Sequence, residues 1–201
     1  MAAVVVLVAE DSAAVVVFPV AAVDLTAAAP RGLVMASTLQ RFWRHLTTTR
    51  GSAQRAFPAA TLKAIQHKIA EGEITHRAEV KMIVEGSLSL PAVLNGVTSR
   101  NRAHELFAHY RIWDTEENVG VLLYVNLADH KVEIVVDRAV GRAIKSAEWQ
   151  AVCKTMTKEF ASGAFHDSTL AALEQMNGYL TQHFPDQGRK KNELSDKPLV
   201  L

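Results

Sequence analysis

One stretch constrains the fold of this chain more than any other, the nearly continuous apolar run VGVLLYVNL from Val119 to Leu127. Its length and its content of β-branched residues favour a strand that is buried on both faces. A short connection, Ala128–Lys131, separates it from the alternating run VEIVVD, so we expect the second strand to return antiparallel to the first. These two strands are predicted to form the centre of the molecule.

Helices and a further strand flank this centre. The segment 78–85 alternates between apolar and charged residues, which predicts a half-exposed strand. An amphipathic helix beginning near Ser99 connects it to the long apolar strand, as in a crossover between parallel strands. Further helices are predicted from Ser146 to about Gly163 and from about Ser168 to His183. The pattern therefore predicts an α/β protein with a mixed sheet and helices packed against it.

The composition divides the chain into four parts. Residues 1–34 consist mostly of Ala and Val, and acidic residues interrupt the apolar runs before any reaches the ~20 residues that span a bilayer. We interpret residues 1–34 as an extension upstream of a start at Met35, and a weak membrane anchor is the alternative. An N-terminal helix and linker follow over 35–56, then the α/β domain over 57–185 and a polar C-terminal tail over 186–201.

A basic amphipathic segment precedes the domain. Its apolar residues are spaced i, i+3, i+4 and i+7, which predicts one face of a short helix: Leu39, Phe42, Trp43 and Leu46. Arginines fall mainly off this stripe. Two interpretations remain open, because the stripe can pack on the chain's own domain or touch acidic lipid. We expect the first, which is the commoner role of such a helix.

Charge and cysteine content exclude several kinds of protein. The formal net charge of +1 gives no long-range field that would attract nucleic acid. The single cysteine, Cys153, excludes an intrachain disulfide and a zinc site built from several cysteines. It falls on the apolar stripe of a predicted helix, so we expect a core thiol. Because no transmembrane segment is predicted, we expect a cytoplasmic protein or one that is peripheral to a membrane.

Several segments, taken in order, resemble a known family. They are the sequence WDTE at Trp113–Glu116, then GVLLYVNLAD, then VEIVVDRAV, then a helix ending KEFASGAF and a last helix ending HFP. Together they are similar to the TPM domain, and most similar to its short bacterial branch. The resemblance implies a three-layer α/β/α sandwich with a small mixed central sheet. It also implies a divalent cation, commonly calcium, near the ends of the central strands, and an association with LemA-like proteins.

Polar and acidic residues gather where the long strand starts and where its partner ends. Asp114, Glu116, Glu117 and Asn118 precede the first strand, and Asp137 ends the second. Antiparallel pairing places the start of one strand beside the end of the other, so we expect Asp137 near this loop. Carboxylate and amide oxygens suit Ca²⁺ or Mg²⁺. We therefore predict a metal site made of Asp114, Glu117, Asn118 and Asp137, and a solvated loop is the alternative.

The resemblance carries two functional expectations. The first is an interaction or accessory domain, linked to membrane-associated assemblies, whose acidic loop binds a divalent cation. The second, suggested by plant members described as acid phosphatases, is a metal-dependent phosphatase acting on phosphomonoesters. The chain contains no CX5R motif, no P-loop and no Gly-rich phosphate cradle, so we favour the first. Two positions depart from the family pattern, since Val119 and Ala139 stand where Asn and Gly are frequent.

Overall fold

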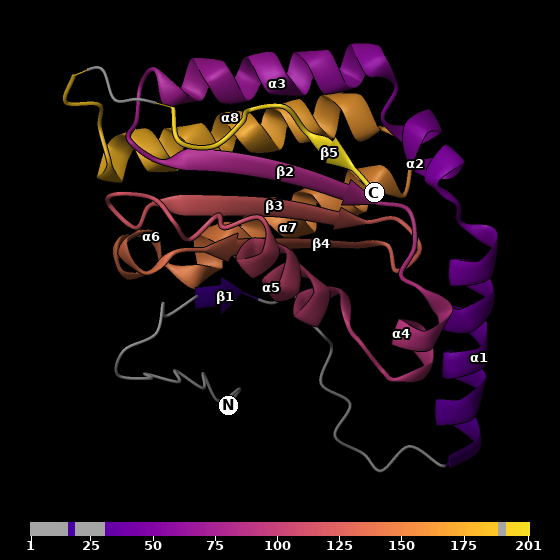
Figure 1. Ribbon diagram of the computed structural model, residues 1–201. Coiled ribbons are helices and arrows are strands. Elements are labelled where there is room, and N and C mark those ends of the chain that lie inside the picture. Colours follow the sequence, from indigo (N-terminus) through magenta and orange to yellow (C-terminus); the bar gives the residue numbers. More distant parts are fainter. Residues whose placement is uncertain (1–15, 19–30, 189–191) are drawn as a thin grey trace.

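A mixed sheet lies at the centre of the molecule, in a computed structural model that describes residues 16–18, 31–188 and 192–201 (Figure 1). The strands are ordered β1-β4-β3-β2-β5 across the sheet. In chain order the elements are β1 (Val16–Phe18), α1 (Arg31–Thr47), α2 (Arg50–Ala56), α3 (Ala59–Glu73), β2 (Glu79–Glu85), α4 (Leu90–Leu94), α5 (Ser99–His109), β3 (Gly120–Asn126), β4 (Lys131–Val136), α6 (Arg138–Ala143), α7 (Ser146–Phe160), α8 (Phe165–His183) and β5 (Leu199–Val200).

The central pairings are those predicted from the sequence. Strands β2 and β3 run parallel, with Glu79 opposite Gly120, and α4 and α5 form the crossover between them. Strands β3 and β4 form the expected antiparallel hairpin, with Val121 opposite Val136. Every residue of β3 is buried, in agreement with its apolar sequence. The mixed central sheet is therefore confirmed.

Side chains alternate between the two faces of the sheet and form two cores, because successive strand residues point in opposite directions. Helices α2, α3, α7 and α8 pack with one core, which includes Met82, Leu123 and Ile134. Helix α5 packs with the other, which includes Leu122 and Tyr124. Figure 1 shows α5 in front of the strands and α7 behind them. The predicted three-layer α/β/α sandwich is the fold of this chain.

Strand β2 differs from the half-exposed strand that its alternating sequence predicts. Only one of its seven residues, Lys81, is more than slightly exposed. The two glutamates at its ends are buried by specific partners, since Glu79 accepts a hydrogen bond from Leu194 N and Glu85 pairs with Arg102. Strand β5 covers its outer edge. The alternation reflects these polar contacts and not an exposed face.

The C-terminal residues take part in the sheet and in the second core. Strand β5 runs parallel to β2, with Leu199 opposite Ile83. Leu194, Leu199 and Leu201 pack against the core that α5 covers. The sequence predicted only a polar tail over 186–201, because the few apolar residues that anchor this segment are widely spaced in it.

Helix α1 orients its apolar stripe differently from the expected packing on the domain. Leu39, Trp43 and Leu46 are among the exposed large hydrophobic residues of the described chain. Most of the predicted extension, residues 1–34, lies outside the described residues, although β1 and the start of α1 fall within its range. In the part of the chain that is described, no helix combines the length and apolar character needed to cross a bilayer.

Candidate functional site

The acidic loop between α5 and β3 is shaped by short-range backbone hydrogen bonds. Asp114 N donates to Arg111 O at 2.9 Å, and Asn118 N donates to Thr115 O at 3.1 Å. Asn118 has a φ of 58°, a left-handed conformation that Asn adopts more readily than most residues. Val119, which departs from the family pattern, has no such conformation and is buried. The special backbone position is therefore Asn118.

Asp137 ends β4 in a fully buried position. Its N–H donates to Gly120 O at 2.9 Å, and its Oδ1 accepts a hydrogen bond from Arg138 N at 2.6 Å, which caps α6. Its other carboxylate oxygen, Oδ2, is buried without a hydrogen-bond partner among the described residues. Burial raises the pKa of Asp137, and the Arg138 N–H and guanidinium charge counteract part of that rise. The site thus contains an acceptor whose hydrogen-bonding capacity is unused.

The hairpin brings Asn118 beside the residues that follow Asp137. Arg138 Nη2 and Nε donate to Asn118 Oδ1 at 3.0 Å and 3.2 Å, and Ala139 N donates to Asn118 O at 3.3 Å. The predicted proximity of the β4 end to the acidic loop is therefore present. Arg138 supplies a positive charge between the end of β4 and the acidic loop.

The two loop carboxylates that were predicted as metal ligands form no hydrogen bond with the end of β4 among the described residues. Glu117 forms an ion pair with Arg77, which lies just before β2. Asp114 is exposed, and its side chain has no hydrogen bond or ion pair among the described residues. Neighbouring Glu116 donates its N–H to Glu193 Oε2 at 2.9 Å, which ties the loop to the C-terminal segment. Asn118 therefore contacts the residues at the end of β4, whereas Glu117 pairs with Arg77 and Asp114 is exposed to solvent.

The donor atoms of this region fit a hard divalent cation in their chemistry. The unpaired Asp137 Oδ2 and the Asn118 amide oxygen lie at neighbouring strand ends, and the loop carboxylates are near in sequence. Oxygen donors of this kind are preferred by Ca²⁺ and Mg²⁺. Over the described residues, no three His, Cys, Asp or Glu side chains are already gathered as a metal site. A cation would therefore have to draw Glu117 or Asp114 toward Asp137.

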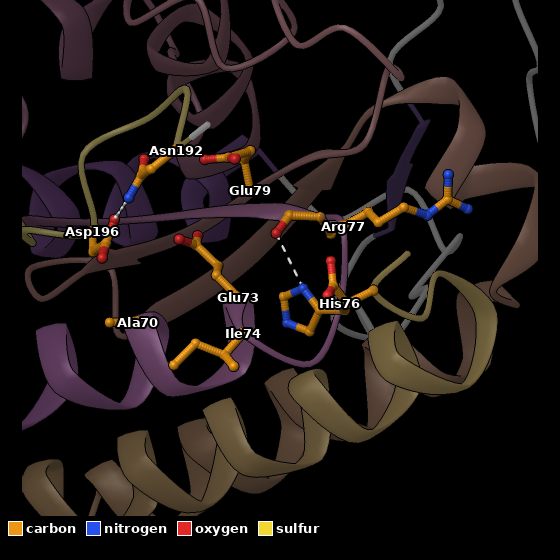
Figure 2. A pocket seen from close by; sticks show the side chains of 10 residues that line it. Ala70, Glu73, Ile74, His76, Arg77, Glu79, Asn192 and Asp196 are labelled. Carbon is orange, nitrogen blue, oxygen red and sulfur yellow. Dashed lines mark hydrogen bonds between the residues drawn. The ribbon is translucent and has the colours of Figure 1, made fainter. Parts of the chain in front are cut away.

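A second acidic group lies at the other side of β2, around a cavity of about 350 Å³. Figure 2 shows Glu73, Glu79 and Asp196 around this space, while the Arg77 side chain points away from it. Burial, followed by the charges of Glu79 and Asp196, raises the pKa of Glu73 to about 8. Sequence patterns could not predict this group, because Asp196 reaches Glu73 only through the folding of the C-terminal segment.

The carboxyl ends of β2 and β3 carry a third polar group. Tyr124 OH donates to Glu85 Oε2 at 2.6 Å, Asn126 Nδ2 donates to Tyr124 OH at 3.1 Å, and Arg102 contacts both Glu85 oxygens. Ligands of open α/β sheets usually bind at such strand ends. Here each side chain already has a partner and Tyr124 is fully buried, so we assign the group a structural role.

The cysteine prediction is consistent with the structure. Cys153 is buried in α7, and burial raises the pKa of its thiol. A thiol held in its neutral form is a poor nucleophile. Cys153 therefore belongs to the core and not to a reactive site.

Comparisons with known proteins agree with the fold described above. A family model described as TPM domain matches residues 53–179. Among solved structures, the chain is similar to the NMR structure of BA42 protein from the psychrophilic bacterium Bizionia argentinensis sp. nov., with a TM-score of 0.63 and 21% sequence identity over 71% of this chain and 94% of that one. At this identity the likeness supports the fold alone. No protein with a curated description matches the chain.

Proposed function

Because the chain belongs to the TPM domain family, we propose that it is an accessory domain that binds Ca²⁺ or Mg²⁺ at the acidic loop and Asp137. The observation that carries this proposal is the fully buried Asp137 carboxylate, whose Oδ2 has no hydrogen-bond partner among the described residues. A buried and unpaired carboxylate oxygen is costly, and a bound cation would offset that cost.

The cation would compete with a charge that is already present. In the described structure Arg138 donates to Asn118 Oδ1, and its charge offsets part of the rise that burial causes in the pKa of Asp137, so its guanidinium partly serves as the counter-charge. A divalent ion supplies more charge to the same oxygens. Asp137 and Asn118 would hold it from the strand ends, with Glu117 and Asp114 completing the oxygen donors from the loop.

The contacts of the loop support an accessory role. Glu117 pairs with Arg77, and the Glu116 N–H bonds Glu193, so a cation that moves the loop would alter both contacts at the protein surface. Such a change can alter the surface that a partner recognises. We extend the proposal to a protein partner of the LemA-like class in a membrane-associated assembly, and its support is the family resemblance alone.

The alternative, a metal-dependent phosphatase, has less support. Asp137 has no exposed surface, so it cannot attack a phosphomonoester without a rearrangement. Arg138 is a candidate anion ligand, but its guanidinium is engaged with Asn118. A cation titration and a phosphatase assay on the same variants distinguish the two functions.

Thermal unfolding of the metal-free protein, titrated with Ca²⁺ and Mg²⁺, tests the proposal. Binding should stabilise the wild type by about 2.7 kcal/mol at a hundredfold excess of cation over Kd. Asp137→Asn retains a capping side chain and Asn118→Gly retains the left-handed backbone, and both should reduce the shift. Asp196→Asn, in the other acidic group, is the matched control and should respond like the wild type.

The result that contradicts the proposal is a wild type whose unfolding temperature does not depend on either cation. Hydrolysis of p-nitrophenyl phosphate is measured on the same proteins. Activity that requires the cation and disappears in Asp137→Asn would favour the phosphatase. Activity that survives both site variants would separate it from this site.

A further inference from the structure

Helix α1 presents an apolar stripe to solvent. Leu39, Trp43 and Leu46 expose 59%, 55% and 45% of their surfaces, and their spacing of i, i+4 and i+7 places them on one face of the helix. Phe42 lies beside Trp43, with ring centroids 6.3 Å apart in an edge-to-face arrangement. An exposed Trp between two exposed Leu residues is unusual on a helix that packs on its own domain.

The orientation of this stripe is fixed by polar contacts on the opposite side of α1. Arg41 Nε and Nη2 donate to the two carboxylate oxygens of Asp129 at 2.8 Å and 2.9 Å. Leu88 N donates to His45 Nδ1, so the remaining ring nitrogen, Nε2, donates to Asp129 at 2.9 Å. His45 is buried. The domain therefore holds the polar side of α1 and leaves the apolar side without a partner among the described residues.

The charge around the stripe is basic. Between residues 31 and 70 the sequence contains no Asp or Glu. Arg44, Arg50 and Arg55 form no ion pair within the described part of the chain, although Arg50 donates to Val200 O and Arg55 to Ser52 Oγ. By contrast, Arg41, Arg77 and Arg102 are all paired with carboxylates. The region of α1 and α2 thus combines exposed apolar side chains with cations that lack carboxylate partners.

We propose that the outer face of α1 docks on the surface of an anionic lipid membrane, with Trp43 at the level of the headgroups. Apolar side chains beside unpaired arginines are the features that hold a helix in the membrane interface, and Trp is enriched there. The basic segment complements the negative charge of the lipid surface. This inference is independent of the proposed cation site.

A second copy of the chain fits these features less well. Three partly exposed side chains offer far less than the roughly 800 Å² per partner that a stable protein interface buries. Two copies meeting through this face would also bring their arginines together. The lipid surface requires neither a large interface nor a complementary acidic protein.

Sedimentation of the full chain with vesicles tests the docking surface. The protein should bind phosphatidylcholine vesicles that contain phosphatidylglycerol, and bind vesicles of phosphatidylcholine alone much more weakly. Trp43→Ser and Leu46→Ser should each reduce the partition coefficient by about tenfold. Arg50→Gln and Arg55→Gln should each reduce it by about fivefold, and added salt should weaken wild-type binding.

A matched control distinguishes this face from exposed apolar residues in general. Ile74, at the end of α3, is 75% exposed, so Ile74→Ser should leave vesicle binding unchanged. Because all five positions lie at the surface, the variants should unfold at the temperature of the wild type. Sedimentation velocity without vesicles reports self-association.

Three outcomes would overturn the proposal. The first is a wild type that does not bind anionic vesicles. The second is binding that persists in Trp43→Ser and Leu46→Ser, which would show that the outer face of α1 is not the docking surface. The third is a concentration-dependent dimer that Trp43→Ser abolishes, in a protein that does not bind vesicles.

Discussion

At the scale of single residues, Gly120 is required by a close approach between two backbone segments. A Cβ at this position would lie 1.8 Å from the carbonyl oxygen of Ile112, a distance that no side chain can occupy. The obstacle is backbone, so the strand or the loop would have to move. Gly120 therefore fixes how the acidic loop joins β3, and the sequence pattern alone does not reveal the contact.

Gly120→Ala should lower the free energy of unfolding by about 3 kcal/mol or more, the cost expected of severe overpacking. Gly178→Ala is the matched control, since a Cβ at Gly178 meets nothing within 4 Å. In the interior of α8 that change should stabilise the protein by roughly 0.5–1 kcal/mol. Urea denaturation measures both. Equal effects for the two variants would contradict the close approach.

Glu73 is expected to make stability depend on pH. Its pKa rises from 4.5 to about 8, chiefly because it is buried, and then because Glu79 and Asp196 are close. Between pH 4.5 and about 8, Glu73 therefore keeps its proton in the folded state and loses it in the unfolded chain. The contribution of Glu73 to stability is complete below pH 4.5 and is lost as the pH rises toward 8, by up to about 1.4 kcal/mol per pH unit.

Glu73→Gln should remove this part of the pH dependence. The amide is neutral at every pH, and its oxygen can still accept the hydrogen bond that Val80 N donates to Glu73. Relative to the wild type, the variant should gain stability as the pH rises from about 5 to about 8. Denaturation midpoints at several pH values measure the difference. Parallel profiles for the two proteins would show that Glu73 is ionised in the folded state.

At the scale of elements, a hydrogen-bonded carboxylate in the β3–β4 turn holds α1. Asp129 accepts hydrogen bonds from Arg41, His45 and Ser99. Burial alone would raise the pKa of Asp129, but these hydrogen bonds outweigh it and lower the pKa below its usual range. The attachment of α1 is therefore complete at neutral pH and is lost only in acid, below the ordinary pKa of an aspartate.

Asp129→Asn should destabilise the protein by roughly 2–4 kcal/mol. Arg41 loses its counter-charge, and the side chains that donate to Asp129 stay at least partly buried. The loss should concentrate at α1. Limited proteolysis is expected to cleave the variant within α1 or at Thr48 before it cleaves elsewhere. Glu71→Gln, which changes an exposed ion pair with Lys68, serves as control and should change stability by less than about 1 kcal/mol. Uniform cleavage in Asp129→Asn would contradict a local role.

The elements differ in how far the sequence predicts them. The hairpin of β3 and β4 was predictable because both strands are marked by local apolar patterns, and α7 and α8 because their stripes are regular. The orientation of α1 was not predictable. Its spacing indicated an inward apolar face, but Asp129, distant in sequence, binds the opposite side. Tertiary contacts of polar residues leave no periodic signal.

At the scale of the whole molecule, the C-terminal segment links otherwise separate parts. Its strand β5 extends the sheet beside β2, Glu193 binds the acidic loop at Glu116 N, and Asp196 joins Glu73 and Glu79 at the cavity (Figure 2). The arrangement of the residues at the candidate cation site could be predicted in part. Register alone placed the end of β4 beside Asn118, whereas the pairing of Glu117 with Arg77 and the burial of Asp137 depend on the complete fold.

The molecule carries two acidic groups, so a cation bound at Asp137 and the acidic loop can be distinguished from one bound at Glu73, Glu79 and Asp196. The measurement is a titration of metal-free, ¹⁵N-labelled protein with Ca²⁺ and with Mg²⁺, followed by the amide resonances. We predict that the resonances of Asn118, Asp137 and Arg138 shift and saturate at one cation per chain. Shifts confined to Glu73, Glu79 and Asp196, or no saturating shift at any residue, would contradict a cation site at Asp137 and the acidic loop.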